Sequence, residues 1–318
     1  MQGDARCGVK RFRQAAAAKL FPAINLLAVI ALNRPSPTAP RRPGIAPISV
    51  AVVVWTMLAG GCMFKAASND RPWCLEHAVM PLAVFDDDQV KIHNVRNFRH
   101  VDELTVNAAY YDLPLDMNEI TTVDLFTSLF QNDVSPIAHT MLSFGTRDRD
   151  QFVVVSIEAR REVGEEFNFV TATTGQLELI YVIADERDII DQRAVVREEK
   201  LLRFPIQVPP KDAKSLFAAL LRDANDLRRK PQIYDLLDNN CTSNLVRHAS
   251  KDLFSAVDRA TLLAFPAYAD VTLRRVGLVD NSLSVSEQRA QAEVNELARR
   301  YRDMPNYSRR IRRELPGI

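Results

Sequence analysis

The chain has 318 residues, of which 47% are hydrophobic and 25% are charged, and its formal net charge is +1. These proportions are ordinary for a globular protein and exclude wholesale disorder. Nucleic-acid-binding proteins normally carry a marked basic excess, so we expect no nucleic-acid partner. Only 10 glycines are present, and neither common Gly-rich phosphate-binding pattern occurs.

The first part of the chain has the pattern of a leader followed by an export or anchor segment. Residues 1–43 are basic, Ala-rich and then Pro-rich, and we expect them to be disordered. Residues 44–62 are uncharged and largely apolar, and Arg41 and Arg42 lie just before them. Basic residues ahead of an apolar run are typical of a signal peptide or a membrane anchor. The alternative is a buried core helix.

The apolar run ends in LAGGC, which resembles a bacterial lipobox with Cys62 as the lipidated residue. The match departs from the usual pattern at Ala59, where a larger aliphatic residue is usual. A lipoprotein and an uncleaved anchor both deliver the residues after Cys62 to the far side of the membrane. We therefore expect a periplasmic domain that is tethered to the inner or the outer membrane.

Residues 69–280 have the pattern of one α+β domain. The polar segment GTRDRD separates two β-type runs and predicts a hairpin. The predicted strands are QVKIHNV, IAHTMLSF, QFVVVSIEA and LELIYVIA, and then a pair formed by AVVRE and LLRFPIQV. An antiparallel sheet that is followed by helices is typical of the α+β class.

Two helices follow these strands. Residues 210–230 carry apolar residues at helical spacing, and Pro231 ends that helix. The second helix begins at Cys241, because Asn240 is a good N-cap and the following LVRHASKDLF again has helical spacing.

At the C-terminus, residues 281–318 predict one amphipathic helix. Ser284 and Glu287 have the spacing of a capping box, and an apolar stripe runs along an Arg-rich surface. Acidic residues interrupt the basic surface, so this helix is expected to dock on the domain or on a partner rather than on DNA. A role at the membrane surface is the alternative.

Cys241 is the candidate nucleophile. A thiol in the first turn of a helix faces unpaired backbone N–H groups and the positive end of the helix dipole, and both favour the thiolate. Two other interpretations stay open. Cys241 is a small buried hydrophobe, or it forms a disulfide with Cys74 in an oxidising compartment.

A thiol nucleophile needs a base, which a third polar group orients. His248 is rejected, because it lies about 10 Å from Cys241 along the same helix. His139 lies on the strand IAHTMLSF, which fixes its direction. If residue 139 pairs with 158, or diagonally with 156, Ser156 and Glu158 emerge on its face. The hypothesis is Cys241 as nucleophile, His139 as base and Glu158 as the orienting carboxylate.

Other polar residues have supporting roles in this hypothesis. Asn240, or the backbone N–H of Cys241, supplies oxyanion contacts, and Ser156 supports the pair. Arg160 and Arg71 are candidates for binding a phosphate or carboxylate of a substrate, or else they form ion pairs that brace the sheet. The cysteines form no C-x-x-C pair and H-E-x-x-H is missing, so we expect no metal or cofactor.

Several blocks of the chain resemble the Lnb-type N-terminal periplasmic domain of bacteria over residues from about 69 to about 248. The blocks are DRPW, IHNVRNF, IAHTMLSFG, VVSIEARREVGEEF, LELIYVIADERDII and PQIYDLLDNNCTSN. The order His139, Glu158, Cys241 is also similar to circularly permuted members of the NlpC-type papain-like superfamily. In those enzymes the histidine strand precedes the cysteine helix.

This resemblance implies a thiol hydrolase or acyltransferase, since some relatives with the domain are linked to N-acylation of bacterial lipoproteins. Longer members add membrane segments after the domain, whereas here a helical tail follows. We expect a membrane-tethered periplasmic thiol enzyme that acts on an acyl or amide group of a lipid, lipoprotein or peptide. The alternatives are a cell-wall peptidase or amidase, and a non-catalytic envelope module for binding or assembly.

Overall fold

The structure, a computed structural model, describes residues 65–102, 105–130, 136–236, 238–248 and 254–313. The predicted leader (1–43) and the predicted anchor with Cys62 (44–62) lie outside these residues. Within the described part of the chain, no helix is both long enough and apolar enough to cross a membrane.

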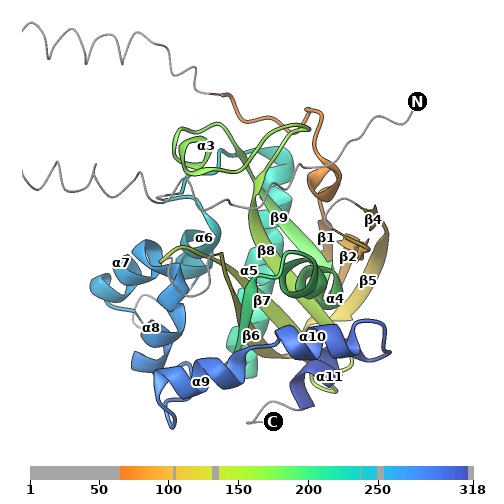
Figure 1. Cartoon of the computed structure of the whole chain (residues 1–318). Coiled ribbons are helices and arrows are strands. Elements are labelled where there is room, and N and C mark those ends of the chain that lie inside the picture. Colours follow the sequence, from red (N-terminus) through yellow and green to blue (C-terminus); the bar gives the residue numbers. More distant parts are fainter. Residues whose placement is uncertain (1–64, 103–104, 131–135, 237, 249–253, 314–318) are drawn as a thin grey trace, which may run out of the picture. The chain divides into compact units, whose positions relative to one another are not determined.

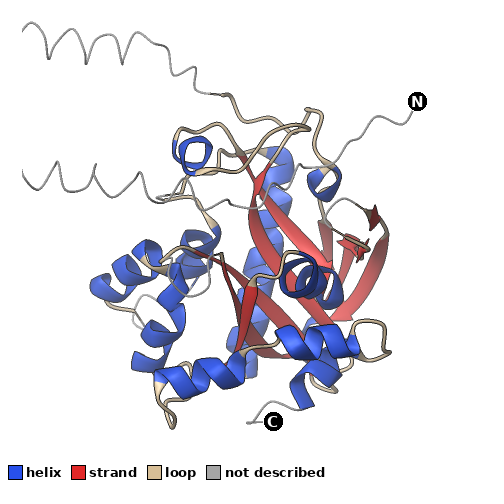
Figure 2. Ribbon diagram, viewed as in Figure 1, coloured by secondary structure: helices blue, strands red, loops and turns tan. Residues whose placement is uncertain are grey.

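A mixed sheet forms the centre of the described structure (Figures 1 and 2). Its strands lie in the order β1-β2-β9-β8-β7-β6-β10, and β5 pairs with β2 off this path. The strands of this sheet are β1 (Leu82–Asp86), β2 (Gln89–Arg96), β5 (Tyr110–Asp116), β6 (Ile120–Leu129), β7 (Ala138–Thr146), β8 (Phe152–Arg160), β9 (Glu178–Asp185) and β10 (Lys200–Ile206). A second, small sheet pairs β3 (Arg99–His100) with β4 (Val106–Asn107).

The predicted antiparallel sheet is confirmed except at one joint. β2 and β9 run parallel, and their register pairs them at Arg96 and Ala184. The predicted β-hairpin is present, with Met141 of β7 opposite Ser156 of β8. The pairing between the two strands ends there, and His139 contacts β8 diagonally through the Ser156 hydroxyl, at 2.8 Å.

Helices cover both faces of the sheet. The long helix α5 (Pro210–Arg229) packs against β1, β6 and β9, and α4 (Glu186–Ile190) packs against β8 and β9 on the opposite face (Figures 1 and 2). The other helices are η2 (Leu75–His77), η3 (Met117–Glu119), α3 (Phe169–Thr173), the π-helix η4 (Asp191–Val196), α6 (Cys241–His248), α7 (Ala256–Ala264), η5 (Pro266–Tyr268), α8 (Ala269–Arg275), α9 (Val285–Ala292), α10 (Asn295–Tyr301) and α11 (Tyr307–Arg313). As a result β7 is buried at every position, and β8 at every position except the half-buried Glu158.

Two predicted elements were wrong. The AVVRE segment belongs to the π-helix η4 rather than to a strand, because its polar neighbours Asp191 and Arg193 turn inward to buried partners. Residues 281–318 do not form one helix but contain α9, α10 and α11. The Ser284–Glu287 capping box is present, yet the helix ends at Glu293, whose backbone is extended and bridges Leu202 of β10.

A buried ion network joins α11 to the sheet. Both guanidinium ends of Arg312 reach the carboxylate of Glu186, at 2.6 and 2.7 Å, and one also reaches Asp124 of β6 at 2.6 Å. Arg203 of β10 binds the other oxygen of Asp124 at 3.0 Å. Burial raises the pKa of Asp124, but the charges of Arg312 and Arg203 outweigh it and hold that pKa below its ordinary value. The C-terminal helices are therefore part of the core.

We predict that Arg312→Met destabilises the protein by about 3–5 kcal/mol, because it leaves Asp124 and Glu186 as buried charges that have lost a partner. The measurement is urea denaturation at neutral pH. Arg229→Met is the matched control, since Arg229 forms an exposed ion pair with Asp226. Equal denaturation midpoints for the two variants would contradict a stabilising role for the network.

Candidate active site

The sequence around Cys241 starts a helix for a visible reason. The side-chain oxygen of Asn240 accepts hydrogen bonds from the backbone N–H groups of Thr242 and Ser243, both at 2.9 Å. The Ser243 hydroxyl accepts one from the N–H of Asn240 at 2.7 Å. These bonds satisfy N–H groups that the first turn leaves free. Cys241 is thereby fixed as the first residue of α6.

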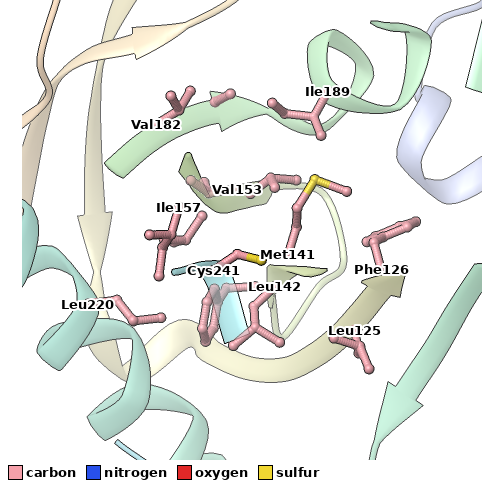
Figure 3. Packing of buried hydrophobic residues seen from close by; sticks show 14 of the residues in the cluster. Leu125, Phe126, Met141, Leu142, Val153, Ile157, Val182, Ile189, Leu220 and Cys241 are labelled. Atoms are coloured by element: carbon pink, nitrogen blue, oxygen red, sulfur yellow. The ribbon is translucent and has the colours of Figure 1, made fainter. Parts of the chain in front are cut away.

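Helix α6 rests on the strands that carry the predicted base. It packs against β7 and β8, and the hydroxyls of Thr140 and Thr242 lie 3.2 Å apart. Cys241 is 6% exposed and belongs to the buried cluster. Figure 3 shows its sulfur beside Met141 and Leu142 of β7.

The surroundings of Cys241 favour the thiolate. Burial raises the pKa of the thiol, but hydrogen bonds from the side chain of His139 and from Thr140, together with the charge of His139, outweigh it. The net effect lowers the pKa of Cys241 to about 6 from an ordinary value of 9.0. His139 is thus close enough to act on the thiol of Cys241.

Ser156 lies between His139 and Glu158. The Nε2 atom of His139 is 2.8 Å from the Ser156 hydroxyl, which donates its proton to Glu158 Oε1 at 2.8 Å. The direct distance from His139 Nε2 to that carboxylate oxygen is 3.8 Å. Because the serine proton is used, the serine oxygen accepts from Nε2–H. Nδ1 of His139 is therefore the nitrogen left to exchange a proton with the thiol: it carries that proton in the thiolate–imidazolium pair and lacks it in the neutral pair.

Glu158 is the anchor of this arrangement, and two elements outside its own strand also contact it. His77 of η2 lies 3.3 Å from Oε2, and Nη2 of Arg193 in η4 lies 3.3 Å from Oε1. The backbone N–H of Arg161 donates to Nδ1 of His77 at 3.2 Å, so His77 presents Nε2–H to Glu158. Burial raises the pKa of Glu158, but the contacts with His77 and Arg193 hold it well below its ordinary value. Glu158 is therefore a fixed anion.

Sequence reasoning missed His77 as part of the site. It lies in a short 3-10 helix near the start of the described chain, and no local pattern connects it with Glu158. Arg193 pairs with Glu199 as well as Glu158. Tyr234 is a further neighbour: burial, then the charges of Cys241 and Glu158, raise the pKa of its hydroxyl.

Asn240 does not have the predicted position for an oxyanion contact. Its side-chain oxygen caps α6, and its amide nitrogen donates to the backbone oxygen of Leu236 at 2.7 Å. The backbone N–H of Cys241 remains the candidate, because an N–H in a first helical turn has no intrahelical acceptor.

The two arginines that were candidates for binding substrate have internal partners instead. Arg160 is 2% exposed, lies 4.0 Å from the Trp73 ring, and donates to Asn69 and to the backbone of His77. Arg71 forms ion pairs with Glu162 and Glu178. Both therefore brace the segment before β1 against the sheet, which is the alternative that the sequence left open.

Cys74 and His248 are the other cysteine and histidine that the sequence placed in relation to Cys241, and the structure shows how each is bonded. Cys241 is a free thiol, whereas Cys74 is disulfide-bonded, so the predicted alternative of a Cys74–Cys241 bridge was wrong. His248 pairs with Asp223 at 2.7 Å, away from Cys241. In the described part of the chain, no group of three or more His, Cys, Asp or Glu side chains is arranged to hold a metal ion.

Residues 108–276 match the protein family described as the Lnb N-terminal periplasmic domain. The chain belongs to this family. The matched segment includes β5 through α8, and so contains Cys241, His139, Ser156 and Glu158. No curated protein and no solved structure matches the chain. The Lnb N-terminal periplasmic domain supports a periplasmic location, while similarity to NlpC-type enzymes stays a prediction.

We predict that alkylation of Cys241 by iodoacetamide reaches half its maximal rate near pH 6, because the thiolate exists above that pH. In His139→Ala the hydrogen bond and charge that lower the pKa are lost while burial remains. The half-maximal point should then rise above that of an ordinary thiol. His248→Ala is the control and should keep it near 6, and Cys241→Ala reports any reaction elsewhere.

The contribution of Ser156 is tested in the same assay. Ser156→Ala frees the imidazole from the hydrogen bond that orients it, so the half-maximal point should move upward, by less than in His139→Ala. Ser143→Ala is a matched control, because Ser143 is equally buried and donates to Glu186 at 2.6 Å. Equal shifts for the two serine variants would contradict a positioning role for Ser156.

Proposed function

We propose that this protein is a periplasmic thiol enzyme that transfers or hydrolyses an acyl group through Cys241. The observation that supports the proposal most directly is the influence of His139 on the thiol of Cys241, whose pKa it lowers, with Ser156 and Glu158 behind the imidazole. A nucleophile, a base and an orienting group in that order are the signature of covalent acyl transfer. A buried structural cysteine does not require this arrangement.

In the proposed first step, the sulfur of Cys241 attacks the carbonyl carbon of an ester or amide, and its proton passes to Nδ1 of His139. The oxygen of the tetrahedral intermediate becomes negative, and the backbone N–H of Cys241 at the start of α6 stabilises it. The intermediate collapses to a thioester as the leaving group takes the proton from His139. The acyl group is then bound to Cys241.

In the second step, water or an amine attacks the thioester carbonyl and gives its proton to His139. Sulfur leaves as the thiolate, and the product is a free acid or an amide. Glu158 keeps its charge throughout. Ser156 donates a hydrogen bond to Glu158 and accepts one from the imidazole, so the carboxylate acts on the imidazole through the serine hydroxyl. The imidazolium that forms in both steps is thereby stabilised in one orientation.

The test uses an activated ester. Incubation with p-nitrophenyl butyrate should release a burst of nitrophenol equal to the enzyme and add one butyryl group to Cys241, as seen by intact mass. His139→Ala should slow acylation by about 10²–10⁴-fold. Adding an amine such as glycinamide separates transfer from hydrolysis by the yield of butyryl amide. A Cys241→Ala variant that releases nitrophenol as fast as the wild type would exclude the mechanism.

The proposal extends to a membrane tether and an envelope substrate, which is an acyl or amide group of a lipid, lipoprotein or peptide. Its support is the apolar run before Cys62, together with the periplasmic family. Mass analysis of the mature protein from the membrane fraction should find lipid on Cys62 or an uncleaved apolar run. A mature chain that lacks both would rule out the tether while leaving the thiol chemistry intact.

A further inference from the structure

A second site lies apart from Cys241. A cavity of about 310 Å³ opens between strands β5, β8 and β9 and the helices α4 and α11. None of Cys241, His139, Ser156 or Glu158 lines it. Its volume is at the lower end of the range for small-molecule pockets in proteins.

Two guanidinium groups of this cavity lack an anionic partner. Arg99 and Arg187 both line it, and neither forms an ion pair within the described residues. Arg187 donates to the backbone oxygen of Met304 at 2.6 Å, and the guanidinium of Arg99 has no hydrogen-bond acceptor there. Burial lowers the pKa of Arg187, and the charge of Arg99 lowers it further, so the two cations repel each other.

The other charged groups at the cavity do not cancel this excess. Asp185 is half-buried, and one of its oxygens already accepts from the N–H of Arg187 at 2.9 Å as the N-cap of α4. Arg309 is paired with Asp150 at 2.8 Å. Asp303, which does not line the cavity, also acts on Arg187. Among the other lining groups, two guanidiniums without an ion pair therefore face one carboxylate, that of Asp185.

The wall of the cavity also offers an unused polar group and an apolar surface. Tyr307 is 3% exposed, and its buried hydroxyl has no hydrogen-bond partner among the described residues. The guanidinium of Arg187 lies 5.2 Å from the centre of the Tyr307 ring. Leu113, Phe152 and Val153 form apolar parts of the lining. An unpaired buried hydroxyl is costly, and an oxygen acceptor from a ligand would relieve that cost.

We propose that this cavity binds a small organic monoanion, with its oxyanion between Arg99 and Arg187 and its apolar part against Leu113 and Phe152. Arginine suits this role because its planar group donates two parallel hydrogen bonds to a carboxylate or a phosphate. The charge of the ligand then balances the excess positive charge. An oxygen of the ligand accepts a hydrogen bond from the hydroxyl of Tyr307. The site is independent of the thiol chemistry.

The test is calorimetric titration of the full chain with two aromatic monoanions, phenylacetate and methyl phenyl phosphate, and with neutral phenylacetamide. At least one anion should bind, and phenylacetamide should not. The preferred anion identifies the ligand as a carboxylate or a phosphodiester. Arg99→Ala should weaken binding at least about tenfold, the loss expected for a charge-assisted hydrogen bond.

The controls separate this site from folding and from Cys241. Arg147→Ala should leave affinity unchanged, because Arg147 is exposed and does not line the cavity. Tyr307→Phe should weaken binding without lowering the unfolding temperature, since it removes an unpaired hydroxyl. Cys241→Ala should bind as the wild type does, whatever its effect on acyl transfer. Absence of binding by both anions, or equal affinity in Arg99→Ala, overturns the proposal.

Discussion

Burial of the central sheet on both faces is the constraint on which the candidate site depends. The polar side chains of β7 and β8 are buried or half-buried, so each needs a partner inside the protein to offset its desolvation. Glu158 meets this demand with donors from its own strand and from two other elements, through Ser156, His77 and Arg193. These donors fix the orientation of the carboxylate. The carboxylate orients the Ser156 hydroxyl by a hydrogen bond, and the hydroxyl orients the imidazole in the same way. The site is rigid because it is buried.

Charge pairing on α4 extends that rigidity to η4. Arg312 binds Glu186, and Arg96 of β2 binds Asp188 through two nitrogens at 2.9 and 3.0 Å. Both carboxylates are fully buried. Helix α4 is thus fixed from opposite directions, and the π-helix that follows it directly delivers Arg193 to Glu158. The contacts that stabilise the fold and those that position the imidazole are therefore parts of one connected set of charges.

The features that could be predicted from the sequence are those that depend on short segments of the chain. The N-cap at Asn240 and the hairpin around GTRDRD are properties of short segments, and both could be predicted from the sequence. The Ser156 bridge and the role of His77 depend on side-chain distances across the fold, and no spacing encodes them. The AVVRE run misled because its two valines favour a strand, whereas the inward contacts of Asp191 and Arg193 hold the segment in a π-helix. The predicted C-terminal helix failed at Glu293, where pairing with β10 competes with helical hydrogen bonds.

The parallel joint between β2 and β9 has a consequence for how the sheet is held together. Backbone pairing there is confined to Arg96 and Ala184, whereas neighbouring strands share long ladders. Side chains do most of the joining: Arg96 to Asp188, and Asn225 of α5, which exchanges two hydrogen bonds with the backbone of Ala83 in β1. Helix α5, which packs against both β1 and β9, thus bridges this joint. A single substitution at this joint would therefore change how strongly β2 is held against β9 without altering a residue of β7 or β8.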